Sequence, residues 1–297
     1  MTILEVGDAS RTARLDHRII DWETVESATY VIRQTVRYEY PVPVTALRQR
    51  LMMIPPERHG DQKRVGWVID ASIPSSRRTS CDRFGNVCVD FRVGAPQRGI
   101  QFESQVVLER SPQQRIPASA PHRSLGRPTA LTAADAELRQ VAADLLAAGH
   151  RELALAEHIC DWVSNRLRYQ SGVTTVVTTA AEACRSGAGV CQDFAHVMLA
   201  VCRAAGIPAR YVSGHLLGEG PSHAWVEVLF PNDGKRSWFA VAFDPTHGRP
   251  AGAAYLTIAT GRDYRDVAPT SGTCVGPRPG TLHTTKDAFL SSVTRRP

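Results

Sequence analysis

The chain has 297 residues, of which 43% are hydrophobic and 22% are charged, and its formal net charge is +6. This composition is typical of a globular protein with one large core or two smaller ones, and it excludes a largely disordered chain. No apolar run reaches the length of a transmembrane helix, and residues 1–21 lack the apolar core of a signal peptide. The sequence therefore predicts a cytoplasmic protein with no membrane partner.

The excess of positive charge lies mainly in the first part of the chain. Residues 1–127 hold 19 Lys and Arg against 14 Asp and Glu, whereas residues 128–297 hold 16 against 15. No basic run with interleaved aromatic residues occurs, so no nucleic-acid partner is predicted. None of the seven cysteines forms a Cys-x-x-Cys pair, so neither a zinc site nor a redox motif is predicted. Cys81 and Cys88 flank a predicted turn and are expected to stay reduced.

The first half of the chain shows the patterns of β structure. Residues 1–26 are polar and aperiodic, and they are expected to form a mobile lead-in. Alternation with period two over residues 30–40 predicts a half-buried strand, which Pro41 and Pro43 are expected to end. Further strands are predicted at residues 65–73, 87–93 and 100–108. Residues 27–110 should therefore form a small antiparallel β domain, with a proline-rich linker at residues 111–131.

The pattern then becomes helical. Thr132 and Asp135 have the spacing of a helix N-terminus, and a second helix is predicted from about Glu152. A short helix near residues 180–185 precedes a longer one that starts at Cys191 and ends before Gly206 and Pro208. Strands are predicted at residues 210–217, 223–230 and 237–243, the last two joined by a turn at residues 232–234.

These patterns predict an α+β fold, in which the small antiparallel β domain is followed by a domain of helices packed on an antiparallel sheet. The second domain is expected to span residues 132–269. Residues 270–297 are rich in Gly, Pro and Thr, and they are expected to form a C-terminal tail without a final hydrophobic strand.

Three residues of the second domain are candidates for chemistry. Cys191 begins a predicted helix, where unpaired N–H groups and the helix dipole favour a thiolate and could stabilise an oxyanion. His223 begins one strand and Asp244 ends the next. Because strands joined by a short turn are antiparallel, these two residues should lie side by side, with the carboxylate orienting the imidazole toward the thiol.

The segments that contain these residues resemble the transglutaminase-like superfamily, in its microbial branch with an N-terminal β domain. The matching segments are Gly-Val-Cys-Gln-Asp-Phe-Ala-His, Ala-Gly-Ile-Pro-Ala-Arg-Tyr-Val-Ser-Gly, His-Ala-Trp-Val-Glu-Val, Phe-Asp-Pro-Thr and Gly-Arg-Asp-Tyr-Arg-Asp-Val-Ala-Pro, which occur in the family's order between residues 189 and 269. Asp-Arg-Phe-Gly-Asn, which begins at residue 82, resembles the family's N-terminal domain. The resemblance implies a papain-like fold and places Cys191, His223 and Asp244 at the positions of the catalytic triad.

The neighbours of the triad also have structural interpretations. Asp193 is expected either to cap its helix or to form a structural salt bridge, and His196 to make a structural hydrogen bond. Gln192 could line the cleft, and Trp225 belongs either to the core or to the cleft wall.

Two functions remain open from the sequence. The first is an enzyme that acts on a peptide or protein amide through a thioester, and we favour hydrolysis over deamidation or transamidation. The second is a non-catalytic peptide-binding module that keeps the fold. No metal-ligand cluster or nucleotide loop is evident, so no metal or cofactor is predicted, and the calcium dependence of animal transglutaminases is not expected here.

Overall fold

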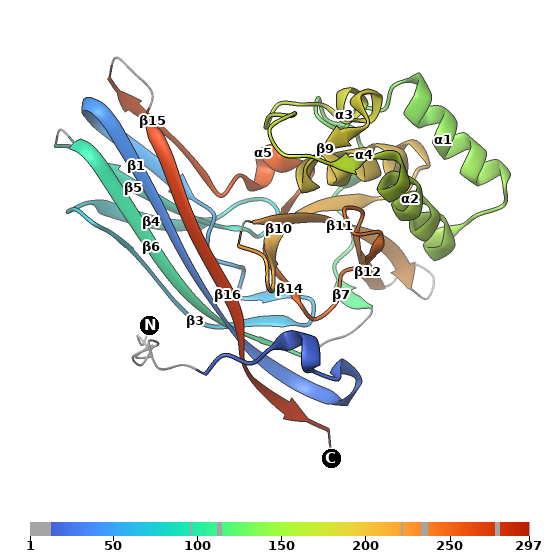
Figure 1. Cartoon of the computed structure of the whole chain (residues 1–297), viewed down its shortest axis with the longest axis horizontal. Coiled ribbons are helices and arrows are strands. Elements are labelled where there is room, and N and C mark those ends of the chain that lie inside the picture. Colours follow the sequence, from blue (N-terminus) through green and yellow to red (C-terminus); the bar gives the residue numbers. More distant parts are fainter. Residues whose placement is uncertain are drawn as a thin grey trace.

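A computed structural model describes residues 13–95, 97–111, 115–220, 222–232, 237–276 and 280–296, and it shows two lobes joined along a broad interface (Figure 1). One lobe is a large antiparallel β sheet, and the other consists of a second antiparallel sheet with helices on one face. The predicted α+β fold is confirmed. No helix among the described residues combines the length and the apolarity needed to cross a bilayer.

The β lobe contains most strands of the first third of the chain and also the last two strands of the described chain. Its strands are β1 (Val25–Leu51), β2 (Arg58–His59), β3 (Gln62–Ala71), β4 (Ser76–Cys81), β5 (Val87–Val93), β6 (Gln97–Arg110), β15 (Thr270–Val275) and β16 (Thr281–Arg295). The order is β2-β3-β6-β1-β5-β4, and both β15 and β16 pair with β1. Alternate residues of β1, such as Tyr30 and Ile32, are fully buried, as expected for a half-buried strand.

The second lobe has its own sheet and a helical layer. Its strands are β7 (Ile116–Ala118), β10 (Ala209–Leu216), β11 (His223–Asn232), β12 (Ser237–Asp244), β13 (Arg249–Pro250) and β14 (Tyr255–Gly261), and a short parallel pair is formed by β8 (Arg168–Tyr169) and β9 (Ala188–Gly189). The helices are α1 (Ala136–Ala147), α2 (Glu152–Arg166), α3 (Ala180–Ser186), α4 (Cys191–Ala204) and α5 (Tyr264–Val267). The sheet order is β13-β12-β11-β10-β14.

Helix α4 forms the centre of the helical layer. Twelve of its fourteen residues, Gln192 to Arg203, are buried, because α1, α2 and α3 surround it and the sheet lies beneath it (Figure 1). The apolar face of the sheet contributes residues such as Val226 and Val228 of β11 to the same core. A helix buried on nearly every side is held rigidly, and its N-terminus is therefore a fixed point for a functional group.

The interface between the lobes is formed largely by apolar side chains of β14. Leu256 and Ile258 belong to the core cluster of the β lobe. Two buried polar groups add specific contacts: the side-chain amides of Gln62 and Asn86 each form hydrogen bonds with the backbone of β14, at Thr257 and Thr260 respectively. The β lobe therefore holds the sheet of the second lobe in a fixed orientation.

The predicted C-terminal tail needs correction. The described part of residues 270–297 forms β15 and β16, and β16 pairs with β1 from Val25↔Arg295 to Glu39↔Thr281. Only Phe289 and Leu290 of β16 are buried. The strand therefore lacks the apolar alternation that reveals strands in sequences, and its pairing depends on β1.

The predicted end of the first strand at Pro41 and Pro43 was also wrong. Strand β1 continues to Leu51, and its register with β6 shifts between Glu39 and Val44, around the two prolines. Proline is tolerated at such irregularities because no ladder hydrogen bond is lost there. Beyond the shift β1 pairs with β5 and β15, so the prolines mark the point where one strand changes partners.

Two smaller expectations also changed. The predicted mobile lead-in contains 3₁₀ turns at His17–Ile19 and Trp22–Thr24, while residues 1–12 lie outside the described chain. The predicted linker contains β7 and a 3₁₀ turn at Arg123–Gly126.

The first helix begins at Ala136 with Asp135 as its N-cap, while Thr132 forms a local turn with Thr129. Part of the predicted turn at residues 232–234 lies outside the described chain.

The cysteines Cys81 and Cys88 lie on the paired strands β4 and β5. The register places Cys81 opposite Val87 and Cys88 opposite Ser80. Neighbouring positions on a strand point to opposite faces of the sheet, so the two thiols point apart.

Candidate active site

The thiol of Cys191 lies at the first position of α4 and is partly exposed, unlike the helix behind it. The chain enters the helix through Val190, whose backbone is extended. Asp193 caps this end, as predicted: its Oδ2 accepts hydrogen bonds from the Val190 N–H at 2.8 Å and from the Thr174 hydroxyl at 2.7 Å. The first N–H groups of a helix have no acceptor within it, so the Cys191 thiol lies beside free donors and the positive end of the dipole.

The glycine before this turn allows the cap to form. A Cβ on Gly189 would lie 2.6–2.8 Å from the carboxylate end of Asp193. Any other residue at position 189 would push this carboxylate away from the Val190 N–H. The Gly-Val-Cys segment thus combines close packing with a helix start, and both fix the position of the thiol.

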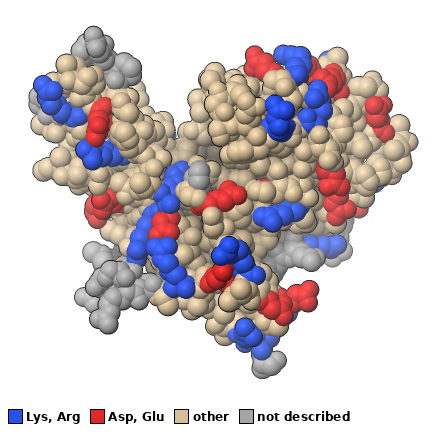
Figure 2. All heavy atoms as spheres, in the orientation of Figure 1, with Lys and Arg blue, Asp and Glu red and all other residues tan. Residues whose placement is uncertain are grey.

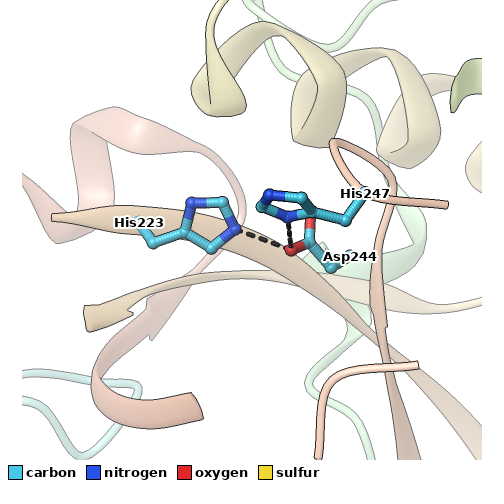
Figure 3. Close-up of side chains that lie close together, drawn as sticks. All are labelled: His223, Asp244 and His247. Carbon is cyan, nitrogen blue, oxygen red and sulfur yellow. Dashed lines mark hydrogen bonds and ion pairs between the residues drawn. The ribbon is translucent and has the colours of Figure 1, made fainter. Parts of the chain in front are cut away.

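His223 and Asp244 lie side by side at one end of the second sheet, as the order of the strands predicted (Figure 3). Strands β11 and β12 are antiparallel, and the Nε2 atom of His223 lies 2.8 Å from Oδ2 of Asp244. Both side chains are buried, with exposed fractions of 4% and 0%. This hydrogen bond occupies Nε2 and leaves Nδ1 on the other side of the ring, and Cys191 is one of the groups that raise the pKa of His223.

The carboxylate of Asp244 accepts four hydrogen bonds. Besides His223, the ring of His247 at 2.6 Å and the hydroxyl of Tyr255 at 2.7 Å donate to Oδ2, while the N–H of Thr246 donates to Oδ1 at 2.9 Å. Burial alone would raise the pKa of Asp244, but the bonds from His223, His247 and Tyr255 outweigh it and hold the pKa well below its usual range. Asp244 is therefore a fixed negative charge.

The electrostatic state of His223 follows from these partners. Burial alone would lower its pKa, but the hydrogen bonds with Asp244 and with Cys191 reverse this effect and raise the pKa to about 10. The imidazole therefore carries its proton at neutral pH beside the thiol. A protonated imidazole beside a cysteine is one of the surroundings in which cysteines react as nucleophiles.

Aromatic rings support the imidazole from behind. Trp225 is 1% exposed, and its ring lies nearly parallel to that of His223, with centroids 6.2 Å apart. Of the two interpretations of Trp225, the structure favours the core. A Cβ on Gly214 would lie 2.5 Å from the Trp225 ring, so glycine is required there. Gln192, the other predicted cleft residue, is 9% exposed in the first turn of α4.

His196 has a structural position rather than a place near the thiol. It is fully buried on α4, where its Nε2 accepts a hydrogen bond from the N–H of Tyr264 at 3.2 Å and its ring packs on Tyr211. Burial lowers its pKa to about 4, so it is neutral at physiological pH. The structural hydrogen bond predicted for His196 is confirmed.

The group formed by His223, Asp244 and His247 could also be considered as a metal site, since its ligand atoms lie within 4.8 Å of one another. The ligands of a tetrahedral zinc ion, each about 2.0–2.2 Å from the metal, lie roughly 3.3 Å apart. The nitrogen–oxygen distances here are 2.8 Å and 2.6 Å. These are hydrogen-bond distances, and the geometry therefore fits a shared proton better than a shared metal.

Three neighbours of the pair were not found from the sequence. His247 and Tyr255 both contact Asp244, and Glu219 lies 3.6 Å from Nδ1 of His223 and 3.5 Å from Nε2 of His247. The sequence Asp-Pro-Thr-His gave a signal for His247, because a turn that starts at Asp244 brings the residue three positions later back toward the carboxylate. Tyr255 and Glu219 depend on the tertiary fold and carry no local signal.

Comparison with known proteins gives the same assignment for both lobes. Residues 139–245 match the family model of the transglutaminase-like superfamily, and residues 30–109 match that of the bacterial transglutaminase-like N-terminal region. An uncharacterized protein of Mycobacterium leprae is 30% identical over 258 residues, which cover 79% of this chain and 89% of the relative. An uncharacterized protein of Mycobacterium tuberculosis strain H37Rv is 29% identical, with coverage of 82% and 86%.

A solved structure has the same fold across both lobes. The structure described as a "Putative Cysteine Protease from Cytophaga hutchinsonii" covers 91% of this chain and 93% of its own, with a TM-score of 0.71 and 22% identity. At this identity the likeness concerns the fold alone. From the match to both family models and the likeness to the mycobacterial relative over most of its length, we conclude that the chain belongs to the transglutaminase-like superfamily.

Proposed function

We propose that this protein is a thiol-dependent enzyme that cleaves peptide or isopeptide-type amides, with Cys191 as nucleophile, His223 as general base and acid, and Asp244 as the residue that orients and charges His223. The observation that carries this proposal is the hydrogen bond between His223 and the buried Asp244, together with Cys191 at a helix N-terminus, where it helps to raise the pKa of His223. Each member has the environment that its role requires.

The first half of the reaction forms a thioester. The sulfur of Cys191 attacks the carbonyl carbon of the amide, and the proton of the thiol resides on Nδ1 of His223. The oxyanion that develops on the carbonyl oxygen accepts a hydrogen bond from the N–H of Cys191. The C–N bond then breaks, and His223 transfers its proton to the leaving amine.

The second half of the reaction releases the acyl group. Water attacks the thioester carbon while His223 removes a proton from it, and the thiol leaves with that proton as the carboxylic acid forms. An amine that replaces water gives transamidation through the same steps, and a glutamine side chain as substrate gives deamidation. Hydrolysis needs only a small nucleophile at the site, and it is the outcome we favour.

Trapping of the acyl-enzyme tests this proposal. The protein is incubated with a panel of glutamine and isopeptide peptides, quenched in acid, in which thioesters survive, and examined by mass spectrometry of its peptides. The expected result is an acyl mass on Cys191 that is absent from the Cys191→Ala variant. Cys202→Ala, which changes a fully buried thiol of the same helix, serves as the control.

Two results would overturn the proposal. The first is an acyl group on another residue in the Cys191→Ala variant. The second is peptide binding of equal affinity in both proteins without any adduct, which would favour the non-catalytic peptide-binding module.

A further inference from the structure

A large cleft adjoins the His223–Asp244 pair and is formed by both lobes. Its volume is about 1140 Å³. Figure 2 shows a notch between the two lobes, with Lys and Arg side chains on the surface of the β lobe below it. Glu219 and Tyr255, which contact His223 and Asp244, line the cleft, and so does the β16 segment from Lys286 to Leu290. A ligand in this cleft would contact β16 and would lie next to Glu219 and Tyr255, which in turn contact the His223–Asp244 pair.

The register of β16 turns Lys286 inward. Lys286 lies opposite Gln34 on β1, and opposed residues share a face of the sheet. Gln34 is 4% exposed, and the next pair on this face is the buried Ile32 with Ala288. The lysine thus projects from the inner face of the β lobe toward the second lobe, although most of its neighbours on β16 are exposed.

The other charged groups of the cleft have partners, whereas Lys286 has none among the described residues. Arg14 pairs with Asp287 and Arg18 pairs with Asp16. Glu219 faces the two histidines, and Arg249 donates to the hydroxyl of Tyr255. Within the described part of the chain, Lys286 forms no hydrogen bond or ion pair.

Burial of an ammonium group without a partner costs free energy, and an anion that binds to the group lowers this cost. Burial lowers the pKa of Lys286 to about 8, while the influence of Cys191 acts in the opposite direction.

We propose that Lys286 binds a carboxylate of the substrate, so that the enzyme acts on amides with an acidic group close to the attacked carbonyl. The inference rests on the proposed function, because it assigns a substrate class to the same site. Lys286 and Glu219 line the same cleft, the register points the lysine inward, and no described side chain pairs with it, so that it can bind an anion. Neutral and cationic amides lack this contact and should be poorer substrates.

A matched pair of alkylating probes tests this inference without knowledge of the natural substrate. Iodoacetate and iodoacetamide both transfer a two-carbon group to a thiolate with loss of iodide, but only iodoacetate carries a carboxylate. The ratio of their rates at Cys191 therefore reports the local charge, and any change in thiol reactivity itself cancels. In Lys286→Met the ratio of iodoacetate to iodoacetamide should fall by about tenfold, the size expected for one nearby charge at partial burial.

Two further variants complete the experiment. Lys286→Arg keeps the charge and should retain most of the preference. Lys63→Met makes the same substitution on β3, which is separated from β16 by β1 and β6, and should leave the ratio unchanged. Raising the salt concentration should shrink the ratio in the wild type and have little effect in Lys286→Met.

Each outcome separates this inference from the proposed function. If the ratio is unchanged in Lys286→Met, the inference is overturned. If Cys191 is still labelled in that experiment, the proposed function is unaffected. An unchanged ratio would mean that Lys286 only prevents edge-to-edge pairing of β16, a common role of inward lysines on edge strands. If neither probe labels Cys191, the proposed function itself fails.

Discussion

Two buried histidines on neighbouring strands have opposite electrostatic states. His223 on β11 is 4% exposed and has its pKa raised to about 10, whereas His215 on β10 is 2% exposed and has its pKa lowered to about 3. Burial acts in the same direction on both, since it disfavours the charged ring. His223 also has Asp244 and Cys191, but His215 has only the repulsive charge of Lys286 nearby. Partners, and not burial, therefore decide which histidine carries a proton.

This difference explains how one compact region supplies both a charged and a neutral imidazole. The region around His223 contains four donors to one carboxylate, which fix the negative charge that the imidazolium needs. The region around His215 offers no hydrogen bond to its ring within the described chain, and it serves packing. Removal of a partner should therefore move His223 toward the behaviour of His215.

The largest effect is expected from Asp244→Asn. Loss of the fixed charge should lower the pKa of His223 toward or below its ordinary value and reduce turnover by about 10³–10⁴, by analogy with the same change in a serine triad. Nuclear magnetic resonance of the histidine ring protons measures the pKa, and steady-state kinetics measures turnover.

Asp61→Asn provides the control for stability in this experiment, because it also removes a buried carboxylate, one paired with Arg110. If Asp244→Asn lowers only the melting temperature and keeps turnover per folded molecule, the role assigned to Asp244 is wrong.

A smaller effect is expected from His215→Val, and it concerns stability. Because the folded pKa of His215 lies near 3 and the unfolded value near 6.5, the unfolded state binds a proton that the folded state does not. Stability is therefore lost as the pH falls from about 6.5 toward 3. Between pH 7 and pH 4.5 the free energy of unfolding should fall in both proteins, but by up to roughly 2 kcal/mol less in the valine variant than in the wild type. Urea unfolding measures this difference.

The raised pKa of His223 has the opposite effect on how stability depends on pH. Its contribution to stability is fully present below about pH 6.5 and is lost as the pH rises through about 10. An Asp244→Asn protein should lack this loss on the alkaline side. Equal pH profiles of unfolding for the wild type and Asp244→Asn between pH 7 and pH 10 would contradict the assignment of a charged His223.

The smallest effect is expected from Tyr255→Phe, which removes one of the four donors to Asp244. A hydrogen bond to a charged group contributes about 1.5–3 kcal/mol to stability, and we expect part of this, about fivefold, to appear in turnover. Tyr30→Phe is a matched control, since its buried hydroxyl donates to the carbonyl of Ala253 at 3.0 Å instead. Equal turnover losses in the two variants would show that the effect of Tyr255 is general packing.

The sequence revealed the parts of the site that local patterns determine. The start of α4 at Cys191 follows from its preceding glycines and its helical period, and the meeting of His223 with Asp244 follows from two strands in succession. The contacts from Tyr255 and Glu219 depend on how a later loop and strand pack against the pair.

The β lobe also has features that local sequence patterns do not predict. The alternation from Tyr30 to Tyr40 predicted the core of β1, but the continuation of this strand past Pro41 depends on a change of partner strands. The β16 strand is mostly exposed and polar, so no periodicity distinguished it from a tail. Lys286 belongs to that strand, and its position in the cleft could not be predicted without knowing that β16 pairs with β1.

Competition among the cysteines tests the central claim most directly. Cys81 and Cys274 are exposed, whereas Cys191 is only partly exposed, so exposure alone predicts that Cys81 and Cys274 react first. With less than one equivalent of iodoacetamide at neutral pH, the account predicts label mainly on Cys191, with this preference lost in His223→Ala. Peptide mapping that finds the label mainly on Cys81 and Cys274, or an unchanged preference in His223→Ala, would contradict the account.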